Sequence, residues 1–305
     1  MALSVLAPAG AGTGAGTGRR RGGFIAFALL TPGLAYLALF FLVPFVSLLL
    51  TSFGVNVPEQ YGVFDYGFRW ENYVEVIGEY WPQFLRSFWF ALLATVFALL
   101  ISYPIAYFIG VRLRERMLLR NLLLVLVIAP FFISFLLRTL AWKQILSDEG
   151  PVVSALQFLG LMGAQDHITG TAFAVVFGLT YNFIPFMTLP LFASLDRLDK
   201  RLLEAGGDLY ASPPQTFFRV TLPLSVPGIV SGTLLTFIPA SGDYVNASQA
   251  FLGSSSTAMI GNVIQSKFLI TVNYPQAASL SILLMAVIVV IVSLYVRRSG
   301  TDDLL

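Results

Sequence analysis

The sequence contains no cysteine and a single histidine, His167. Without cysteine there is no disulfide framework, no thiol nucleophile and no Cys-ligated metal. One histidine leaves a histidine metal site or a Ser-His-Asp triad without its parts. Apart from Asp243 and His167, no close set of acid, base and nucleophile is present. We therefore expect no metal site, no cofactor and no catalytic site, so the chain is not expected to be an enzyme.

Charge is also scarce. Charged residues make up 11% of the 305 residues, whereas hydrophobic residues make up 57%. A soluble domain carries roughly 25% charged residues, which cover its water-facing surface. The mean hydropathy is +0.80. This composition predicts an integral membrane protein.

Long apolar stretches give the number of membrane crossings. A spanning helix needs about 20 mostly apolar residues. Six stretches qualify, so we predict an all-α polytopic membrane protein with six transmembrane helices, at residues 24–53, 84–110, 119–141, 171–194, 223–243 and 276–296. Residues 151–163 are apolar but too short to span, which favours an interfacial or re-entrant helix.

Prolines within the spans indicate kinks. Proline removes a backbone hydrogen bond, and a membrane tolerates this where neighbouring helices or a water-filled cavity satisfy the freed groups. Kinked spans favour a pathway that opens and closes, although proline is also common in membrane helices generally. The prolines are Pro32, Pro44, Pro104, Pro130, Pro185, Pro190 and Pro239.

The ends of the chain and its charge distribution predict the orientation. Residues 1–23 contain the low-complexity run Ala9 to Gly18 and are expected to form a disordered cytoplasmic tail. Residues 298–305 are expected to form a second cytoplasmic tail. With both termini inside, the inner segments hold 13 of the 18 basic residues and the outer loops hold nine of the 16 acids. This bias agrees with the positive-inside rule.

The segment between the fourth and fifth spans has an unusual pattern. Asp199 is placed to cap a short amphipathic helix over 200–209, and Ser212 with Gln215 matches a capping box that begins a second helix. This second helix leads to Pro223, where the fifth span begins. The pattern fits an amphipathic connector on the membrane, or a docking hairpin for a soluble partner.

This segment resembles a known family signature. Glu204-Ala205-Gly206, followed by Val220 and Leu222-Pro223, is similar to the EAA signature of binding-protein-dependent ABC importer permeases. The resemblance implies a type I ABC importer transmembrane domain over 84–297 with a coupling loop at 196–223. Two positions depart from the signature. Gly206 stands for its second alanine, and Tyr210 falls on its glycine, which predicts a changed turn.

The resemblance also implies partners. Its coupling helix sits in a cleft of an ATPase subunit, where Glu204 would meet a basic group and the neighbouring leucines would pack. The chain has no GxxxxGK[ST] motif, so ATP hydrolysis is assigned to a separate subunit. The implied assembly, in a bacterial cell membrane, contains an ATP-binding dimer, a second and different permease, and an extracytoplasmic substrate-binding protein. The implied coupling residues are Leu202, Leu203, Glu204, Ala205, Gly206 and Leu209.

Residues 237–245, 260–265 and 273–278 are similar to the first permease subunit of spermidine/putrescine uptake systems. That subgroup also includes opine, aminoethylphosphonate and iron permeases, so these substrates remain alternatives. Acidic outer loops would concentrate a polycation. Trp142, Tyr181 and Tyr244 lie near the outer ends of spans, where they fit either ammonium-binding ring faces or an ordinary aromatic belt.

Two ionisable residues near the spans are further candidates. Asp243 beside Tyr244 is predicted either to cradle an ammonium group, next to a helix break at Pro239 and Gly242, or to be a solvated acid at the membrane edge. Arg138, within the third span, is expected to pair with an acid or to extend outward to water. An ion-gradient-driven transporter remains a weaker alternative, because it would need no cytoplasmic docking hairpin and we find no paired broken helices.

Overall fold

The structure is a computed structural model that describes residues 18–57, 60, 62–163 and 165–298. Residues 1–17 of the predicted N-terminal tail and residues 299–305 of the C-terminal tail lie outside the described residues. The first helix already begins at Gly18, so residues 18–23 are helical where a tail was expected. The chain divides into two units, Met1–Leu50 and Thr51–Leu305.

The first unit is one long helical stretch. It contains α1 (Gly18–Leu37) and the π-helical segment η1 (Ala38–Leu42), and α2 (Val43–Ser52) continues to the start of the second unit. The stretch Leu29–Ser52 is long and apolar enough to cross a membrane. The predicted first span is confirmed in length and composition.

The second unit contains a short antiparallel strand pair and the remaining helices. The strands are β1 (Val55–Asn56) and β2 (Phe64–Asp65). The helical elements are α3 (Glu71–Tyr107), η2 (Phe108–Arg112), α4 (Met117–Ile128), η3 (Ala129–Phe132), α5 (Phe135–Leu146), α6 (Pro151–Phe158), α7 (Ala172–Asp196), α8 (Lys200–Asp208), α9 (Pro213–Thr216), η4 (Phe217–Thr221), α10 (Leu222–Leu224), α11 (Val226–Ser241), η5 (Ser255–Thr257), α12 (Ile260–Leu269) and α13 (Tyr274–Arg298).

The described residues contain four helices that could each span a membrane, or up to six if two bent pairs count as one span each. The predicted all-α membrane fold is confirmed. The second span differs at its start, because α3 begins at Glu71 and not near residue 84. Its first turns carry Glu71, Glu75 and Glu79, which a search for apolar stretches excludes.

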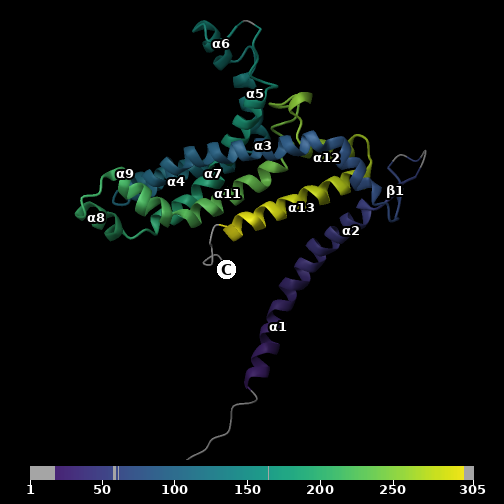
Figure 1. The fold of residues 1–305 in the computed structure, drawn as a ribbon, viewed down its shortest axis with the longest axis horizontal. Coiled ribbons are helices and arrows are strands. Elements are labelled where there is room, and N and C mark those ends of the chain that lie inside the picture. Colours follow the sequence, from purple (N-terminus) through teal and green to yellow (C-terminus); the bar gives the residue numbers. More distant parts are fainter. Residues whose placement is uncertain (1–17, 58–59, 61, 164, 299–305) are drawn as a thin grey trace, which may run out of the picture. The chain divides into compact units, whose positions relative to one another are not determined.

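The third span, predicted over 119–141 with a kink at Pro130, is broken at this proline. The pair Met117–Phe132 and Phe135–Phe158 is bent by 95°. Pro130 lies in the 3-10 turn η3, and Ile133 after it is extended. Proline cannot donate the helical hydrogen bond, so the helix ends here. In Figure 1, α5 and α6 stand away from the layer formed by α3, α7 and α11.

The fifth span bends by 63° between Pro213–Leu224 and Val226–Ser241. This bend lies at Ser225, whereas the break expected at Pro239 and Gly242 falls at Gly242, the C-cap of α11. Pro239 lies inside α11, which ends at Ser241, directly before Gly242. In the fourth span, α7 remains continuous through Pro185 and Pro190.

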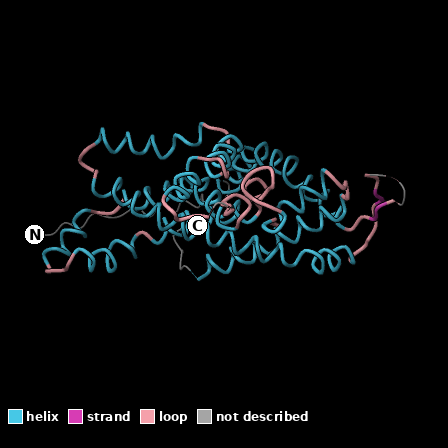
Figure 2. The backbone as a smooth tube through the Cα atoms, turned by 90° about the horizontal axis from the view of Figure 1, so that it is seen from above, coloured by secondary structure: helices cyan, strands magenta, loops and turns pink. Residues whose placement is uncertain are grey.

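Helices α3, α7 and α11 form the core of the second unit, and small residues let them approach closely. A Cβ added at Gly228 would lie 2.5 Å from Ser194 Cβ, and one added at Gly232 would lie 2.7 Å from Met187 Sδ. Figure 2 shows that helices make up nearly all of the described backbone, with the strand pair at one end. Within this unit, α8 and α9 lie at one end, and α12 and β1 lie at the other (Figure 1). The distribution of basic residues makes the α8 end cytoplasmic.

Candidate functional site

The cytoplasmic hairpin, residues 199–224, is built by the caps that its sequence predicts. Asp199 Oδ1 accepts a hydrogen bond from the backbone N–H of Arg201 at 3.0 Å, which starts α8. The backbone N–H of Ser212 donates to Gln215 Oε1 at 2.9 Å, which starts α9. The helical path then continues through η4 and α10 to the fifth span.

The turn between the two arms is left-handed at Tyr210, whose φ is +56°. The N–H of Leu209 donates to the carbonyl of Ala205 at 3.1 Å, and the N–H of Ala211 donates to that of Gly206 at 3.0 Å. This is the bonding pattern of a helix end that normally carries glycine. The turn therefore keeps the left-handed geometry that glycine favours, in place of the changed turn predicted from tyrosine.

Gly206 allows the two arms of the hairpin to touch. A Cβ added there would lie 2.9 Å from Thr216 Oγ1 and 3.1 Å from its Cγ2. Such distances are shorter than ordinary van der Waals contact, so alanine would push the arms apart. Glycine at this signature position thus has a packing reason.

Aromatic contacts attach the hairpin to α3. The Phe217 ring lies 5.5 Å from the Tyr103 ring and 6.0 Å from the Tyr107 ring, both edge-on. The Tyr103 hydroxyl lies 2.8 Å from Ser225 Oγ, at the bend before α11. These contacts hold the hairpin against α3 and tie α3 to the bend at Ser225.

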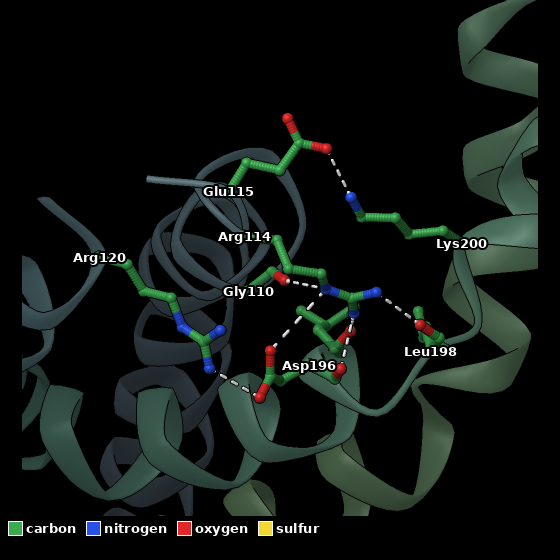
Figure 3. A network of polar contacts seen from close by, with 8 residues as sticks. Gly110, Arg114, Glu115, Arg120, Asp196, Leu198 and Lys200 are labelled. Atoms are coloured by element: carbon green, nitrogen blue, oxygen red, sulfur yellow. Dashed lines mark hydrogen bonds and ion pairs between the residues drawn. The ribbon is translucent and has the colours of Figure 1, made fainter. Parts of the chain in front are cut away.

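Arg114 attaches the end of α7 to the short loop between η2 and α4 (Figure 3). Its guanidinium donates to the carbonyl oxygens of Leu195 at 3.0 Å, Asp196 at 2.6 Å and Leu198 at 2.8 Å, and also to Gly110 at 3.2 Å. A helix ends with unpaired carbonyls and a partial negative charge, which a cation stabilises. Arg114 therefore fixes the C-terminal end of α7.

Two ion pairs extend this network (Figure 3). Arg120 Nη2 lies 2.8 Å from Asp196 Oδ2. Lys200 Nζ lies 2.7 Å from Glu115 Oε1, so the first residue of α8 is linked to the same loop. The hydrogen bond and the positive charge of Lys200 hold the pKa of Glu115 below its ordinary value.

A cavity of about 470 Å³ lies between the hairpin and the inner end of α3, with η2 and the loop after η2. Its charged lining residues include Arg114, Glu115 and Lys200 of the polar network, together with Glu204. The lining residues are Tyr107, Val111, Arg112, Arg114, Glu115, Lys200, Leu203, Glu204, Ala211, Pro213, Thr216, Phe217 and Thr221.

The six predicted coupling residues share α8 and the turn after it but differ in exposure. Leu202, Glu204, Ala205 and Leu209 are exposed to water, whereas Leu203 is half-buried and Gly206 is buried. Among the described residues, Glu204 has no hydrogen bond or ion pair. Its carboxylate is available to a partner, whereas Gly206 faces Thr216.

On the outer side, Asp243 is 7% exposed and is held by its own turn. Asn246 donates its backbone N–H to Asp243 Oδ1 at 2.8 Å and its side-chain amide to Oδ2 at 3.1 Å. Asn182 in α7 in turn donates to Asn246 Oδ1 and to Thr139 Oγ1, both at 3.1 Å. These contacts join the segment after α11 to α7 and α5.

Sequence reasoning missed the three partners Thr139, Asn182 and Asn246. Their signal was the presence of polar side chains within or beside apolar spans, which must find partners because lipid offers none. Asn182 Oδ1 nevertheless has no hydrogen-bond partner among the described residues.

The structure brings two of the predicted aromatic residues together. The Trp142 and Tyr181 rings lie 5.1 Å apart, edge-on, and Trp142 also lies 4.7 Å from the Phe177 ring. Tyr244 is exposed, and its carbonyl accepts a hydrogen bond from Asn262 in α12 at 2.7 Å.

Arg138 behaves in neither of the ways expected from the sequence. It is 7% exposed, so it does not extend to water, and no acid pairs with it in the described part of the chain. Its guanidinium carbon lies 5.8 Å from the centre of the Phe135 ring. Its Nε and Nη1 have no hydrogen-bond partner among the described residues.

Comparison with known proteins adds independent evidence. The family model described as "Binding-protein-dependent transport system inner membrane component" matches residues 102–299. The spermidine/putrescine transport system permease protein PotB of Haemophilus influenzae is 36% identical over 269 residues, which cover 87% of this chain and 91% of that protein. PotB of Salmonella typhimurium LT2 is 37% identical over 265 residues, which cover 87% of this chain and 90% of that protein.

Among solved structures, a chain of a bacterial ABC transporter involved in the import of the acidic polysaccharide alginate has a similar fold. The TM-score is 0.66 and the sequence identity 18%, and the match covers 93% of this chain and 98% of that chain. At this identity the likeness concerns the fold alone.

Proposed function

The chain belongs to the family of binding-protein-dependent transport system inner membrane components, and we propose that it forms half of the translocation pathway of an ABC importer for polyamines. The predicted family and the inner-membrane location are confirmed by the family match and by the PotB relatives. Polyamine specificity is supported by these relatives, which carry spermidine and putrescine in their names and share 36–37% of aligned residues.

The cytoplasmic hairpin is the proposed coupling element to the ATPase. The observation that carries this role is the Arg114 network, which holds the end of α7 to the loop before α4, together with the Lys200–Glu115 pair, which links the exposed helix α8 to the same loop. A force applied to α8 by a closing ATPase dimer would reach α7 through Leu198 and Asp196, and α3 through Phe217. Interfaces built from packed helices shift between discrete arrangements, which suits alternating access.

The outer part of the pathway is proposed to involve Trp142, Tyr181, Tyr244 and Asp243. The edge-on pair of Trp142 and Tyr181 offers aromatic surface to an ammonium group. Both carboxylate oxygens of Asp243 already accept hydrogen bonds from Asn246, so its proposed role is to shape the turn beside the path. The acidic outer loops then concentrate the polycation.

The proposed assembly contains this chain, a second and different permease, two ATPase subunits and an extracytoplasmic binding protein. The family description itself names dependence on a binding protein. One chain with up to six spans supplies one side of a pathway, so a second permease is needed to complete it. Purification of an active transporter with two copies of this chain and no other permease would contradict this composition.

Transport competition tests the substrate. The full complex, reconstituted in proteoliposomes with its binding protein, should take up labelled spermidine in an ATP-dependent way. Unlabelled putrescine should compete with this uptake, whereas an opine, aminoethylphosphonate or ferric ion should not. Competition by one of these three but not by putrescine would assign the importer to another solute.

A further inference from the structure

Tyr210 combines two unfavourable properties at the tip of the hairpin. It is the left-handed residue of the turn, with φ +56°, where a side chain with a Cβ is strained and glycine is not. Its side chain is also 98% exposed, so packing against the described part of the chain does not compensate for the strain. Strained residues persist where the surrounding structure holds them, and they cluster at functional sites.

The turn holds Tyr210 firmly in this position. Hydrogen bonds from Leu209 and Ala211 close the turn on either side of it. The arm after the turn is fixed to α3 by Phe217, and α8 before it is fixed by Lys200 and Glu115. The aromatic ring is therefore presented to the cytoplasm from a backbone whose position is already determined, which lowers the entropic cost of binding.

Other apolar side chains of the hairpin are exposed as well. Leu209, next to Tyr210, is 80% exposed, and Leu202 and Phe218 also face water. Contiguous exposed apolar residues on a soluble-facing segment mark an interaction site. A tyrosine supplies a large apolar surface with a polar tip, and such residues carry much of the binding energy in protein interfaces.

We propose that Tyr210 is an aromatic anchor that enters a pocket of the cytoplasmic ATPase subunit and determines which ATPase this permease accepts. This inference rests on the proposed coupling role of the hairpin. A protein partner is favoured over the membrane surface by charge, because the charged residues nearest to Tyr210 in the sequence are the exposed acids Asp208 and Glu204, whereas the exposed cations Arg201 and Arg219 are each nine positions away. The inner leaflet is anionic and would repel these carboxylates. An ATPase that normally pairs with a permease carrying glycine at this position, and whose surface is flat there, would bind this permease less tightly.

The test uses the complete permease pair in nanodiscs, titrated with the purified ATPase subunit. Tyr210→Gly removes the ring and the strain together, so it should raise the thermal midpoint of the permease. It should also weaken ATPase binding by about tenfold or more, as expected for loss of an aromatic anchor. Tyr210→Phe keeps the ring and should bind within about threefold of the parent, which corresponds to a small part of an anchor's contribution.

Two further variants separate the ring from backbone flexibility and from general surface effects. Asparagine adopts the left-handed conformation more readily than most residues but lacks the backbone flexibility of glycine. Tyr210→Asn should therefore lose affinity for the ATPase as Tyr210→Gly does. Tyr66→Gly removes a tyrosine that is also exposed but follows β2 at the opposite end of the unit, and it should leave ATPase binding unchanged.

The outcomes distinguish the anchor from the coupling role. If Tyr210→Gly and Tyr210→Asn bind the ATPase as the parent does while Glu204→Lys does not, the anchor is refuted and the coupling hairpin stands. Normal ATPase binding in all of these variants removes the coupling role as well. In a chain whose four native tryptophans are replaced by phenylalanine, quenching of Tyr210→Trp fluorescence by brominated lipid, and not by added ATPase, would assign the ring to the membrane and overturn the proposal.

Discussion

The guanidinium of Arg114 donates to the main-chain oxygen of Asp196 at 2.6 Å, across 82 residues of sequence. This contact joins the loop after the second span to the end of the fourth span. It lies directly before α8, whose exposed residues are proposed to meet the ATPase. The contacts of Arg114 thus lie between α8 and the membrane helices. A movement of the ATPase would have to pass through this region to reach those helices.

Arg114→Ala should uncouple ATP hydrolysis from uptake. The variant leaves several carbonyls at the end of α7 without a donor, and hydrogen bonds to a charged group contribute about 1.5–3 kcal/mol each. Because the side chain is partly exposed, we expect a total loss of about 2 kcal/mol in stability, together with fewer spermidine molecules transported per ATP hydrolysed. Arg116→Ala, two residues away and exposed, is the matched control and should behave as the parent. Equal transport ratios in the two variants would remove Arg114 from coupling.

Glu204→Lys should leave the membrane part folded, because the side chain is exposed and has no partner among the described residues. It reverses the charge offered to the ATPase, and loss of a charge-assisted contact at an interface costs about 2 kcal/mol or more. Expression should be normal, whereas substrate-stimulated ATP hydrolysis should fall strongly. Glu149→Lys makes the same change on the outer side and should not affect ATPase binding. Normal uptake by Glu204→Lys would exclude this residue from the mechanism.

Gly206→Ala tests the contact between the hairpin arms. Alanine favours a helix by about 1 kcal/mol over glycine. The new Cβ would, however, lie 2.9 Å from Thr216 Oγ1, and the β-branched threonine has little freedom to move. We expect the clash to prevail, so that the thermal midpoint falls. With Thr216→Ala in the same chain the space opens, and Gly206→Ala should then raise the midpoint. Stabilisation by Gly206→Ala alone would show that the arms can separate without cost.

The Glu115 and Lys200 pair should contribute to stability in a pH-dependent way. The pKa of Glu115 is lowered in the folded chain from its ordinary value of 4.5. Its contribution is therefore fully present above that value and is lost as the pH falls through the lowered pKa. Glu115→Gln should have a lower thermal midpoint than the parent at neutral pH, and the difference should shrink as the pH falls below 4.5 and vanish once it is below the lowered pKa of Glu115. A difference that stays constant across this range would show that the ion pair does not contribute.

Asp243→Asn separates binding of the cation from the turn-shaping role proposed above. Asparagine keeps an acceptor for the backbone N–H of Asn246 and removes the charge, at the loss of the longer bond from the side-chain amide of Asn246. If Asp243 shapes the turn, uptake should stay within about twofold of the parent, whereas Asp243→Ala should lower both stability and uptake because it leaves buried donors unpaired. A strong loss of uptake in Asp243→Asn, with assembly and basal ATP hydrolysis intact, would instead assign the carboxylate to binding the cation.

Features that depend on local sequence could be predicted well. The spans follow from apolar length, and the caps at Asp199 and Ser212 follow from residue types that satisfy free N–H groups at helix starts. Pro130 marked the third span as irregular, but the 95° bend also depends on how the flanking helices pack. Proline alone does not fix an angle, as the unbroken path of α7 through Pro185 and Pro190 shows.

Features that depend on contacts between distant residues could not be predicted. The basic residues near Arg114 indicated the cytoplasmic side, but nothing local distinguishes the arginine that caps α7 from Arg116, which is exposed. The contact between Asn182 and Asn246 joins residues 64 positions apart. Tyr210 was recognised as unusual, but its left-handed backbone follows from the hydrogen bonds that close the turn around it.

The placement of the two anchors of the hairpin has a consequence for protein engineering. Before the hairpin, Arg114 binds main-chain oxygens up to that of Leu198. After its turn, Phe217 packs against α3. The exposed hairpin residues that are proposed to meet the ATPase all lie between Leu198 and Phe217 or next to them. Residues 201–216 can therefore be replaced by the matching segment of another permease without changing the two contacts that attach the hairpin. A hairpin transplanted from another permease should bring its own ATPase preference into this scaffold, while the cargo accepted by the membrane helices stays that of the recipient.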